Sequence, residues 1–102
     1  MNPFKQANKL MQDMETLQKE LAETEVSGES GTGMVKVIMT CMQKVRSIKI
    51  SPELLVPSDV EILEDLIIAA MNDAQRKADE ARESKTKAIL PNIPGLPGLG
   101  GF

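Results

Sequence analysis

The spacing of apolar residues along the chain predicts two helices that flank three short strands. Over residues 4–24, apolar side chains recur at alternating intervals of three and four, which is the spacing of one face of an α-helix. From residue 26 to residue 51 the period changes to two, as in strands, and a Gly31-Thr32-Gly33 turn separates the first two strands. A second helical pattern then continues to about Lys87. Because the connections between the strands are short, this order predicts an α+β fold (α-β-β-β-α) with a three-stranded antiparallel sheet.

The central strand, residues 34–42, has apolar residues on both faces. Val35, Val37, Met39 and Cys41 alternate onto one face, which we expect to pack against the helices. The opposite face is only half polar, and we expect it to meet a second subunit. A lone cysteine in such a strand is typically a small core residue, and we assign Cys41 that role.

The second helix is expected to be long and to begin with a capping box. Ser58 fits the N-cap position and Glu61 the third helical position, from which each side chain could bond the other's backbone. About thirty residues at 1.5 Å each make a rod of roughly 45 Å, whereas a strand of about eight residues spans roughly 27 Å. We therefore expect the C-terminal turns of the helix to project past the sheet. Its predicted buried stripe consists of Leu63, Leu66, Ile67, Ala70, Met71, Ala74, Ala78 and Ala81.

Composition indicates one domain that needs a partner. The chain has 102 residues, and the Pro/Gly-rich residues 89–102 are expected to form a flexible tail after a domain at residues 1–88. The chain has only two Phe and no Trp or Tyr, although aromatic side chains usually supply much of a small core's buried area. We therefore expect a homodimer.

Several kinds of chemistry are disfavoured by what the sequence lacks. There is no histidine, which is the commonest general base and transition-metal ligand, and Cys41 is the only cysteine. Gly28–Gly33 is not followed by the Lys and Ser/Thr of a phosphate-binding loop, so we interpret it as a hairpin. The sequence thus predicts no enzyme, no catalytic residues, no cofactor, no metal and no small-molecule substrate.

The absence of a signal-peptide pattern and of a long apolar run predicts a cytoplasmic protein that does not enter a membrane.

Charge is unevenly distributed along the chain. The net charge is −3, which as a whole does not favour a nucleic-acid partner. However, five bases stand against three acids between Arg76 and Lys87, and the first ten residues contain Lys5 and Lys9 and no acid. The helical bases also lie four residues from acids (Asp73–Lys77, Arg76–Glu80 and Glu83–Lys87), so they could serve either as internal ion pairs or as phosphate contacts.

Four sequence segments resemble the YbaB/EbfC family of bacterial nucleoid-associated proteins. They are Leu10-Met11-Gln12-Asp13-Met14, the segment from Val26 to Val37 with its Gly-Glu-Ser-Gly turn, Ile48–Leu55, and Leu63–Ala74 with Ala-Ala-Met-Asn-Asp-Ala. The resemblance covers about residues 4–88, and the Pro/Gly-rich tail also looks like the family's. It implies a tweezer-shaped homodimer, located in the nucleoid, whose protruding helices grip duplex DNA with little sequence specificity.

We therefore predict a nucleoid-associated protein that binds double-stranded DNA through its helix ends. A dimeric adaptor or chaperone, docking a protein through apolar surface such as the tail, is the alternative. The predicted DNA-binding residues are Lys5, Lys9, Arg76, Lys77, Arg82, Lys85 and Lys87.

Overall fold

The fold is α+β, as the apolar pattern predicts. A computed structural model describes residues 3–89, in which a first helix, α1 (Pro3–Glu23), leads into a sheet, and a long second helix, α2 (Val60–Ile89), returns along it. The strands are β1 (Glu25–Ser30), β2 (Val35–Thr40) and β3 (Val45–Ile50). Two single turns of 3-10 helix, Pro52–Leu54 and Pro57–Asp59, connect the sheet to α2. The predicted flexible tail begins at residue 89, but Ile89 is the last residue of α2, and residues 90–102 lie outside the described part.

The sheet is an antiparallel meander in the order β1-β2-β3. Gly31, Thr32 and Gly33 all have positive φ angles, of 57°, 53° and 88°, which glycine adopts without the steric cost of a Cβ. These residues therefore form the β1–β2 hairpin turn, and the interpretation of this segment as a hairpin is confirmed. In the β2–β3 turn, Gln43 also has a positive φ, of 63°, and with Thr32 it is one of two non-glycine residues in the described range 3–89 that do.

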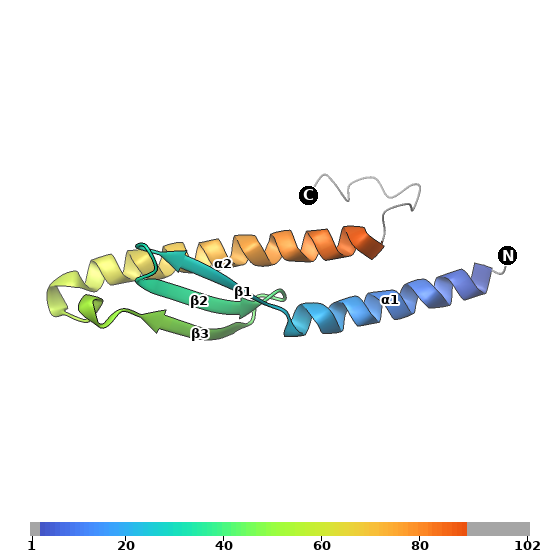
Figure 1. Ribbon diagram of the computed structural model, residues 1–102, viewed down its shortest axis with the longest axis horizontal. Helices are drawn as coiled ribbons and strands as arrows, with labels where there is room; N and C mark the ends of the chain where they lie inside the picture. The colour runs from blue at the N-terminus through green and yellow to red at the C-terminus, as the bar shows by residue number, and fades with distance from the viewer. Residues whose placement is uncertain (1–2, 90–102) are drawn as a thin grey trace.

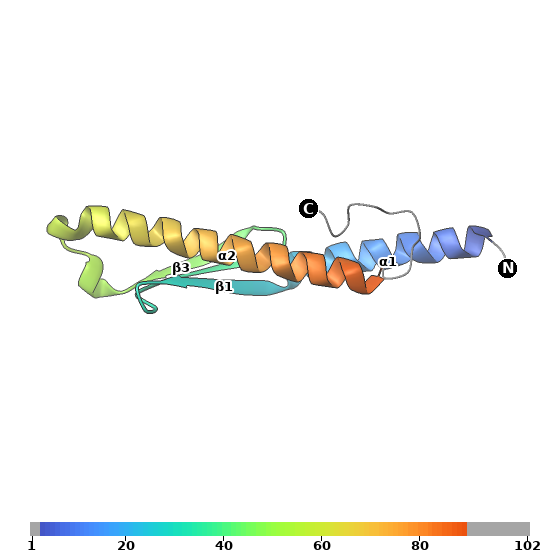
Figure 2. The same cartoon turned by 90° about the horizontal axis from the view of Figure 1, so that it is seen from above.

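The main core lies between one face of the sheet and the alanine stripe of α2. Val35, Val37 and Met39 are fully buried against Ala70, Ala74 and Ala78, so the predicted inward faces of the central strand and of α2 are confirmed. Figure 2 shows α2 running lengthwise over the sheet. Its main sheet contacts are with β1 and β2 and not with β3.

A second, smaller core joins α1 to the C-terminal half of α2. Leu17, Leu21 and Cys41 are buried there, with Met14, Ala81 and Ile89 packed around them. The role of Cys41 as a small core residue is confirmed. Both α1 and the end of α2 extend beyond the sheet in the same direction and lie side by side (Figures 1 and 2). The prediction that the C-terminal turns of α2 project past the sheet is thus also confirmed.

The predicted capping box at the start of α2 is wrong. Pro57 begins a 3-10 turn that contains Ser58, and the N-cap of that turn is Val56, which makes no side-chain capping hydrogen bond. Because Pro57 fixes its own φ in the helical range, Ser58 is drawn inside the turn instead of occupying the extended conformation of an N-cap. The α-helix itself begins at Val60.

Exposed apolar residues do not gather where the sequence pattern suggested. On the sheet face away from α2, half-buried Ile38 is flanked in register by Ser27 and Ser47, so that face is largely polar. On the α2 side, Val45 and Ile48 of β3 stay 40% and 46% exposed, because α2 does not reach across that strand. The α2 side of β3 is therefore one exposed apolar surface, and further exposed apolar residues lie in the connection to α2 and on α2 itself, at Leu55, Val60, Ile62 and Ile68.

Candidate nucleic-acid interface

The seven predicted DNA-binding residues fall into three groups in space. Lys5 and Lys9 lie on the N-terminal half of α1, beyond the end of α2 (Figure 1). Arg82, Lys85 and Lys87 lie on the last turns of α2, on the part that extends past the sheet. Arg76 and Lys77 instead lie beside β1, because Lys77 reaches the backbone of Ser27. The structure thus brings five of the seven residues to the projecting end.

The bases of α2 are paired with acids of the same chain. The three pairs predicted from the four-residue spacing are all present, with nitrogen–oxygen distances of 3.2 Å for Asp73–Lys77, 2.8 Å for Arg76–Glu80 and 3.0 Å for Glu83–Lys87. Arg82 also pairs with Asp79 at 2.8 Å, and Lys85 with Glu20 of α1 at 3.7 Å. Pairs on an exposed helix surface contribute only about 0–1 kcal/mol each, so they hold these bases weakly.

Asp73 is the centre of a denser group of contacts. Its carboxylate accepts a hydrogen bond from the backbone N–H of Glu29 at 3.0 Å, and it also binds Arg76 at 2.8 Å and Lys77 at 3.2 Å. The Glu29 amide, followed by the hydrogen bonds from Arg76 and Lys77, lowers the pKa of Asp73 to about 2. Hydrogen bonds to Asp73 and Glu80 in turn raise the pKa of Arg76.

Lys77 has a structural role as well as a charge. Its ammonium donates to the carbonyl oxygen of Ser27 at 2.9 Å, while Asp73 binds the amide of Glu29 two residues along β1. These two side chains satisfy polar groups on the outer edge of β1, which would otherwise be open to pairing with another strand.

Lys5 and Lys9 differ from the bases of α2. Both side chains are exposed, and neither forms an ion pair with any residue in the described range 3–89. Residues 3–12 contain these two bases and no acid, so this segment carries a charge of +2. It is the part of the projecting end whose positive charge is not offset locally.

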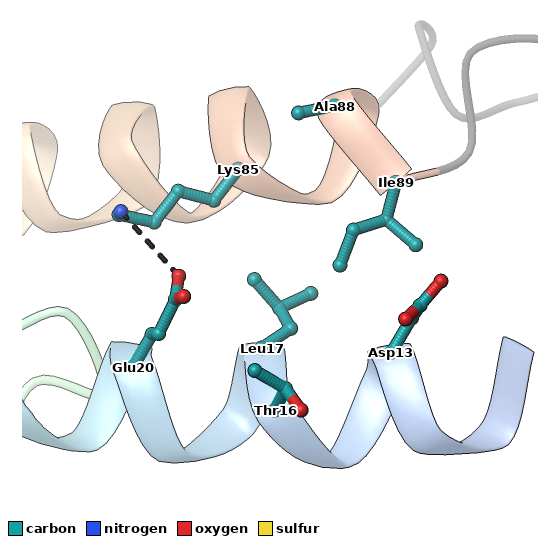
Figure 3. A pocket seen from close by; sticks show the side chains of 7 residues that line it. All are labelled: Asp13, Thr16, Leu17, Glu20, Lys85, Ala88 and Ile89. Atoms are coloured by element: carbon teal, nitrogen blue, oxygen red, sulfur yellow. Dashed lines mark ion pairs between the residues drawn. The ribbon is translucent and has the colours of Figure 1, made fainter. Parts of the chain in front are cut away.

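A groove separates α1 from the end of α2. It has a volume of about 470 Å³ and is lined by Asp13, Thr16, Leu17, Glu20, Lys85, Ala88 and Ile89. Figure 3 shows Leu17 and Ile89 approaching each other across it, with the Glu20–Lys85 pair toward one end and Asp13 toward the other. Two carboxylates and one ammonium leave the lining with a charge of −1, which does not favour phosphate.

Bases on the sheet were missed by the sequence reasoning. Between Met34 and Ser51 the chain contains four bases, Lys36, Lys44, Arg46 and Lys49, and no acid. Lys36 and Lys49 lie directly opposite each other in the β2–β3 register, an arrangement in which like charges repel. A count of charges along the strands would have found this group.

Two further kinds of site were searched for among residues 3–89. No group of three His, Cys, Asp or Glu side chains in this range could hold a metal ion. Within the same range, none of the helices has the length and apolar character that a bilayer-crossing segment needs.

Comparison with known proteins gives consistent matches over nearly the whole chain. Residues 1–93 match the YbaB/EbfC DNA-binding family. A nucleoid-associated protein of Neisseria gonorrhoeae strain NCCP11945 is 45% identical over 101 residues, covering 97% of this chain and 89% of the relative. One from Bradyrhizobium sp. strain ORS 278 is 48% identical over 97 residues, covering 95% of this chain and 92% of the relative.

A similar fold is found in a crystal structure of an uncharacterised protein from Helicobacter pylori. The TM-score is 0.75 at 22% sequence identity, and the match covers 88% of this chain and 98% of the other.

Proposed function

Because this chain belongs to the YbaB/EbfC DNA-binding family, we propose that it is a nucleoid-associated protein that binds duplex DNA as a homodimer in the bacterial cytoplasm. The observation that supports this function best is the family match over residues 1–93, combined with a projecting helical end that presents locally unpaired bases. We assign it no catalysed reaction, cofactor or small-molecule substrate.

The proposed DNA contacts are made mainly by the projecting end. Lys5 and Lys9 are exposed and can meet phosphates without first leaving an ion pair in the described part of the chain. Arg82, Lys85 and Lys87 must exchange an acid for a phosphate, at a small cost because their pairs are weak surface pairs. Such contacts hold the DNA backbone and do not distinguish base sequences.

Arg76 and Lys77 complete the predicted set of DNA-binding residues, but their contacts also favour a structural role. Both bind Asp73, and Lys77 also bonds β1. A phosphate at this position would compete with contacts that hold α2 to the sheet. We therefore expect substitution of these two bases to affect folding stability as well as DNA binding.

In a homodimer, a small number of bases per chain is sufficient for binding DNA. Two copies present each base twice, and a twofold axis can place both projecting ends against one duplex. The exposed β3 residues Val45 and Ile48 are the proposed contact between the copies, because they extend the buried core face of β2 beyond the cover of α2.

The salt dependence of DNA binding tests this proposal. The affinity of the full chain for a long duplex is measured from low to moderate salt and compared with that of a Lys5→Gln/Lys9→Gln variant. Four lost phosphate contacts per dimer would reduce the slope of log affinity against log salt by about 3–4.

The matched control is Lys19→Gln, which removes an exposed base from the half of α1 beside α2. It should leave the slope nearly unchanged. The proposal is refuted if the full chain does not bind duplex DNA at low salt. An unchanged slope in the Lys5/Lys9 variant would remove those two residues from the site.

A further inference from the structure

The outer face of the sheet, which is turned away from α2, is basic over β2 and β3. Because Val35, Val37 and Met39 pack against α2, the residues that alternate with them along β2 point the opposite way. The bases on this part of the outer face are Lys36, Arg46 and Lys49, and β2 and β3 contain no acid. Together with the half-buried Ile38, these residues form what we call the basic face.

The charges of the basic face are only partly neutralised within the chain. Lys36 pairs with Glu29 at 3.8 Å and Arg46 with Glu25 at 3.9 Å, and both acids belong to β1. Lys49 forms no ion pair with any residue in the range 3–89, and it lies directly opposite Lys36 in the strand register. Two like charges in this position repel each other, so a negatively charged surface placed over them would relieve the repulsion.

α2 presents a surface of the required charge on the side away from the sheet. Glu61, Glu64, Asp65 and Ile68 have the spacing i, i+3, i+4 and i+7 of one helix face. Ile68 precedes the buried Ala70 by two residues, which turns its side chain about 200° away from the sheet. It is 59% exposed, and none of the three acids forms an ion pair within the described part of the chain. We call these four residues the acidic face.

The two faces complement each other in charge and in layout. Three bases border Ile38 on the basic face, and three acids border Ile68 on the acidic face. Along β2, Lys36 and Ile38 are about 7 Å apart, and along α2 the step of one turn from Glu64 to Ile68 is about 6 Å. The charged and the apolar positions can therefore meet at the same time, which gives the apolar centre and polar rim typical of protein interfaces.

The two faces lie on opposite sides of one chain, because the sheet forms one layer and α2 the other (Figure 2). A chain therefore cannot join its own faces, and two copies cannot both use their basic and acidic faces against each other. Contact between unlike faces instead repeats from copy to copy and produces an open row.

We infer that the basic face of this protein binds the acidic face of a second copy, so that copies assemble head to tail. This contact is distinct from the proposed dimer contact at Val45 and Ile48, because it is largely ionic and is therefore screened by salt. It requires neither DNA nor the dimer, so the inference goes beyond the proposed function and its tests succeed or fail independently.

Sedimentation velocity of the full chain without DNA tests the assembly directly. At low salt, the average mass should rise above that of the smallest species as the protein concentration is increased to about 1 mM. At high salt the mass should return to that of the smallest species, because salt screens charges on exposed surfaces. A mass that stays constant with concentration at low salt would overturn the inference.

Reversing the charge of each face tests which surfaces meet. Arg46→Glu/Lys49→Glu reverses the basic face, and Glu64→Lys/Asp65→Lys reverses the acidic face. Each variant alone then has two faces of like charge and should self-associate roughly tenfold more weakly than the unmodified chain. An equal mixture should associate again, because each face meets one of opposite charge, and this recovery would also show that both variants are folded. A mixture that does not associate contradicts the head-to-tail contact.

The matched control is Glu15→Lys/Glu23→Lys, at two exposed positions of α1. It changes the net charge by the same amount as the acidic-face variant and should self-associate as the unmodified chain does. Duplex DNA is the alternative occupant of the basic face. If Arg46→Glu/Lys49→Glu lowers the affinity for duplex DNA but leaves self-association unchanged, the basic face holds DNA and the inference is overturned.

Discussion

Gly28 shows how one residue sets the distance between two elements. A Cβ at this position would lie 2.3 Å from both the carbonyl oxygen of Ala70 and the amide nitrogen of Ala74. These atoms belong to the backbone of α2 and cannot move aside as a flexible side chain can. The glycine in β1 and the alanines in α2 are therefore parts of one close contact, which aromatic or branched residues would not fit.

Gly28→Ala is accordingly expected to destabilise the fold by more than about 3 kcal/mol, because the added methyl forces α2 away from β1. Urea unfolding of the two proteins at neutral pH measures the difference. A change below about 1 kcal/mol would show that the helix can shift at little cost.

The adjacent substitution Ser27→Ala is the control for this measurement. The hydroxyl of Ser27 is buried and has no hydrogen-bond partner in the described part of the chain. Its removal leaves no other group unsatisfied, so stability should change by less than about 0.5 kcal/mol or increase.

At the scale of elements, α2 both covers one face of the sheet and bonds the polar groups at its β1 edge. Its alanine face packs on β1 and β2, while Asp73 and Lys77 bond the amide of Glu29 and the carbonyl of Ser27. Ser30 adds a third tie, because its hydroxyl donates to the carbonyl of Leu66. One edge of the sheet is thus protected by side chains of a helix.

The Asp73 contacts should make stability depend on pH. The pKa of this carboxyl falls from 3.8 to about 2 in the folded chain. Its stabilising contribution is therefore fully present above pH 3.8 and is lost as the pH falls through 2. Asp73→Asn should flatten the pH dependence of the urea midpoint between pH 4 and 2 while lowering stability at pH 6.

Asp65→Asn, which removes an exposed carboxylate from the same helix, serves as the control and should retain the wild-type dependence. If Asp73→Asn keeps the full loss of stability between pH 4 and 2, other carboxylates are responsible for it.

At the scale of the whole molecule, one long helix covers only part of the sheet. Because α2 lies over β1 and β2, the apolar residues Val45 and Ile48, which β3 places on the same side of the sheet, are left partly exposed. The other face of the sheet is occupied by polar and charged residues such as Lys36, Ser47 and Lys49. This asymmetry favours the α2 side of β3 for contact between two copies.

Two substitutions on adjacent residues of β3 separate the faces. Ile48→Glu places a charge on the proposed interface and should weaken dimerisation at least tenfold, about 1.4 kcal/mol, in sedimentation equilibrium. Ser47→Glu places the same charge on the opposite face and should leave the dimer intact. The reverse result would support the face that the sequence pattern first suggested.

Local periodicity predicted the elements well because each element is amphipathic. The C-terminal half of the α1 stripe, the alternation of β2 and the alanine-rich stripe of α2 all proved to be core faces, whereas Leu10 in the N-terminal half of α1 is exposed. The start of α2 was predicted incorrectly, since Pro57 competes with Ser58 for the geometry of the helix entrance. A local sequence signal, here the serine of a capping box, fails where a second signal, the preceding proline, favours a different backbone conformation.

For the candidate site, the sequence located bases but not their partners. It identified the helix pairs at a spacing of four, including Glu83–Lys87. It could not identify the Lys85–Glu20 pair or the bond from Lys77 to Ser27, which join residues far apart in the chain. The bases of the sheet could be counted in the sequence, but the position of Lys36 directly opposite Lys49 follows only from the register of the strands.

The sequence by itself determined which faces of β2 and α2 are buried and where the chain turns, because these depend on periods of two and 3.6 residues and on local glycine and proline. Only the tertiary structure decided that α2 covers two strands and leaves the third open. It also decided that Lys5 and Lys9 lie beyond the end of α2, with no acid of the described chain paired to them. The physical reason is that coverage and ion pairing depend on distances between elements, which a one-dimensional pattern does not contain.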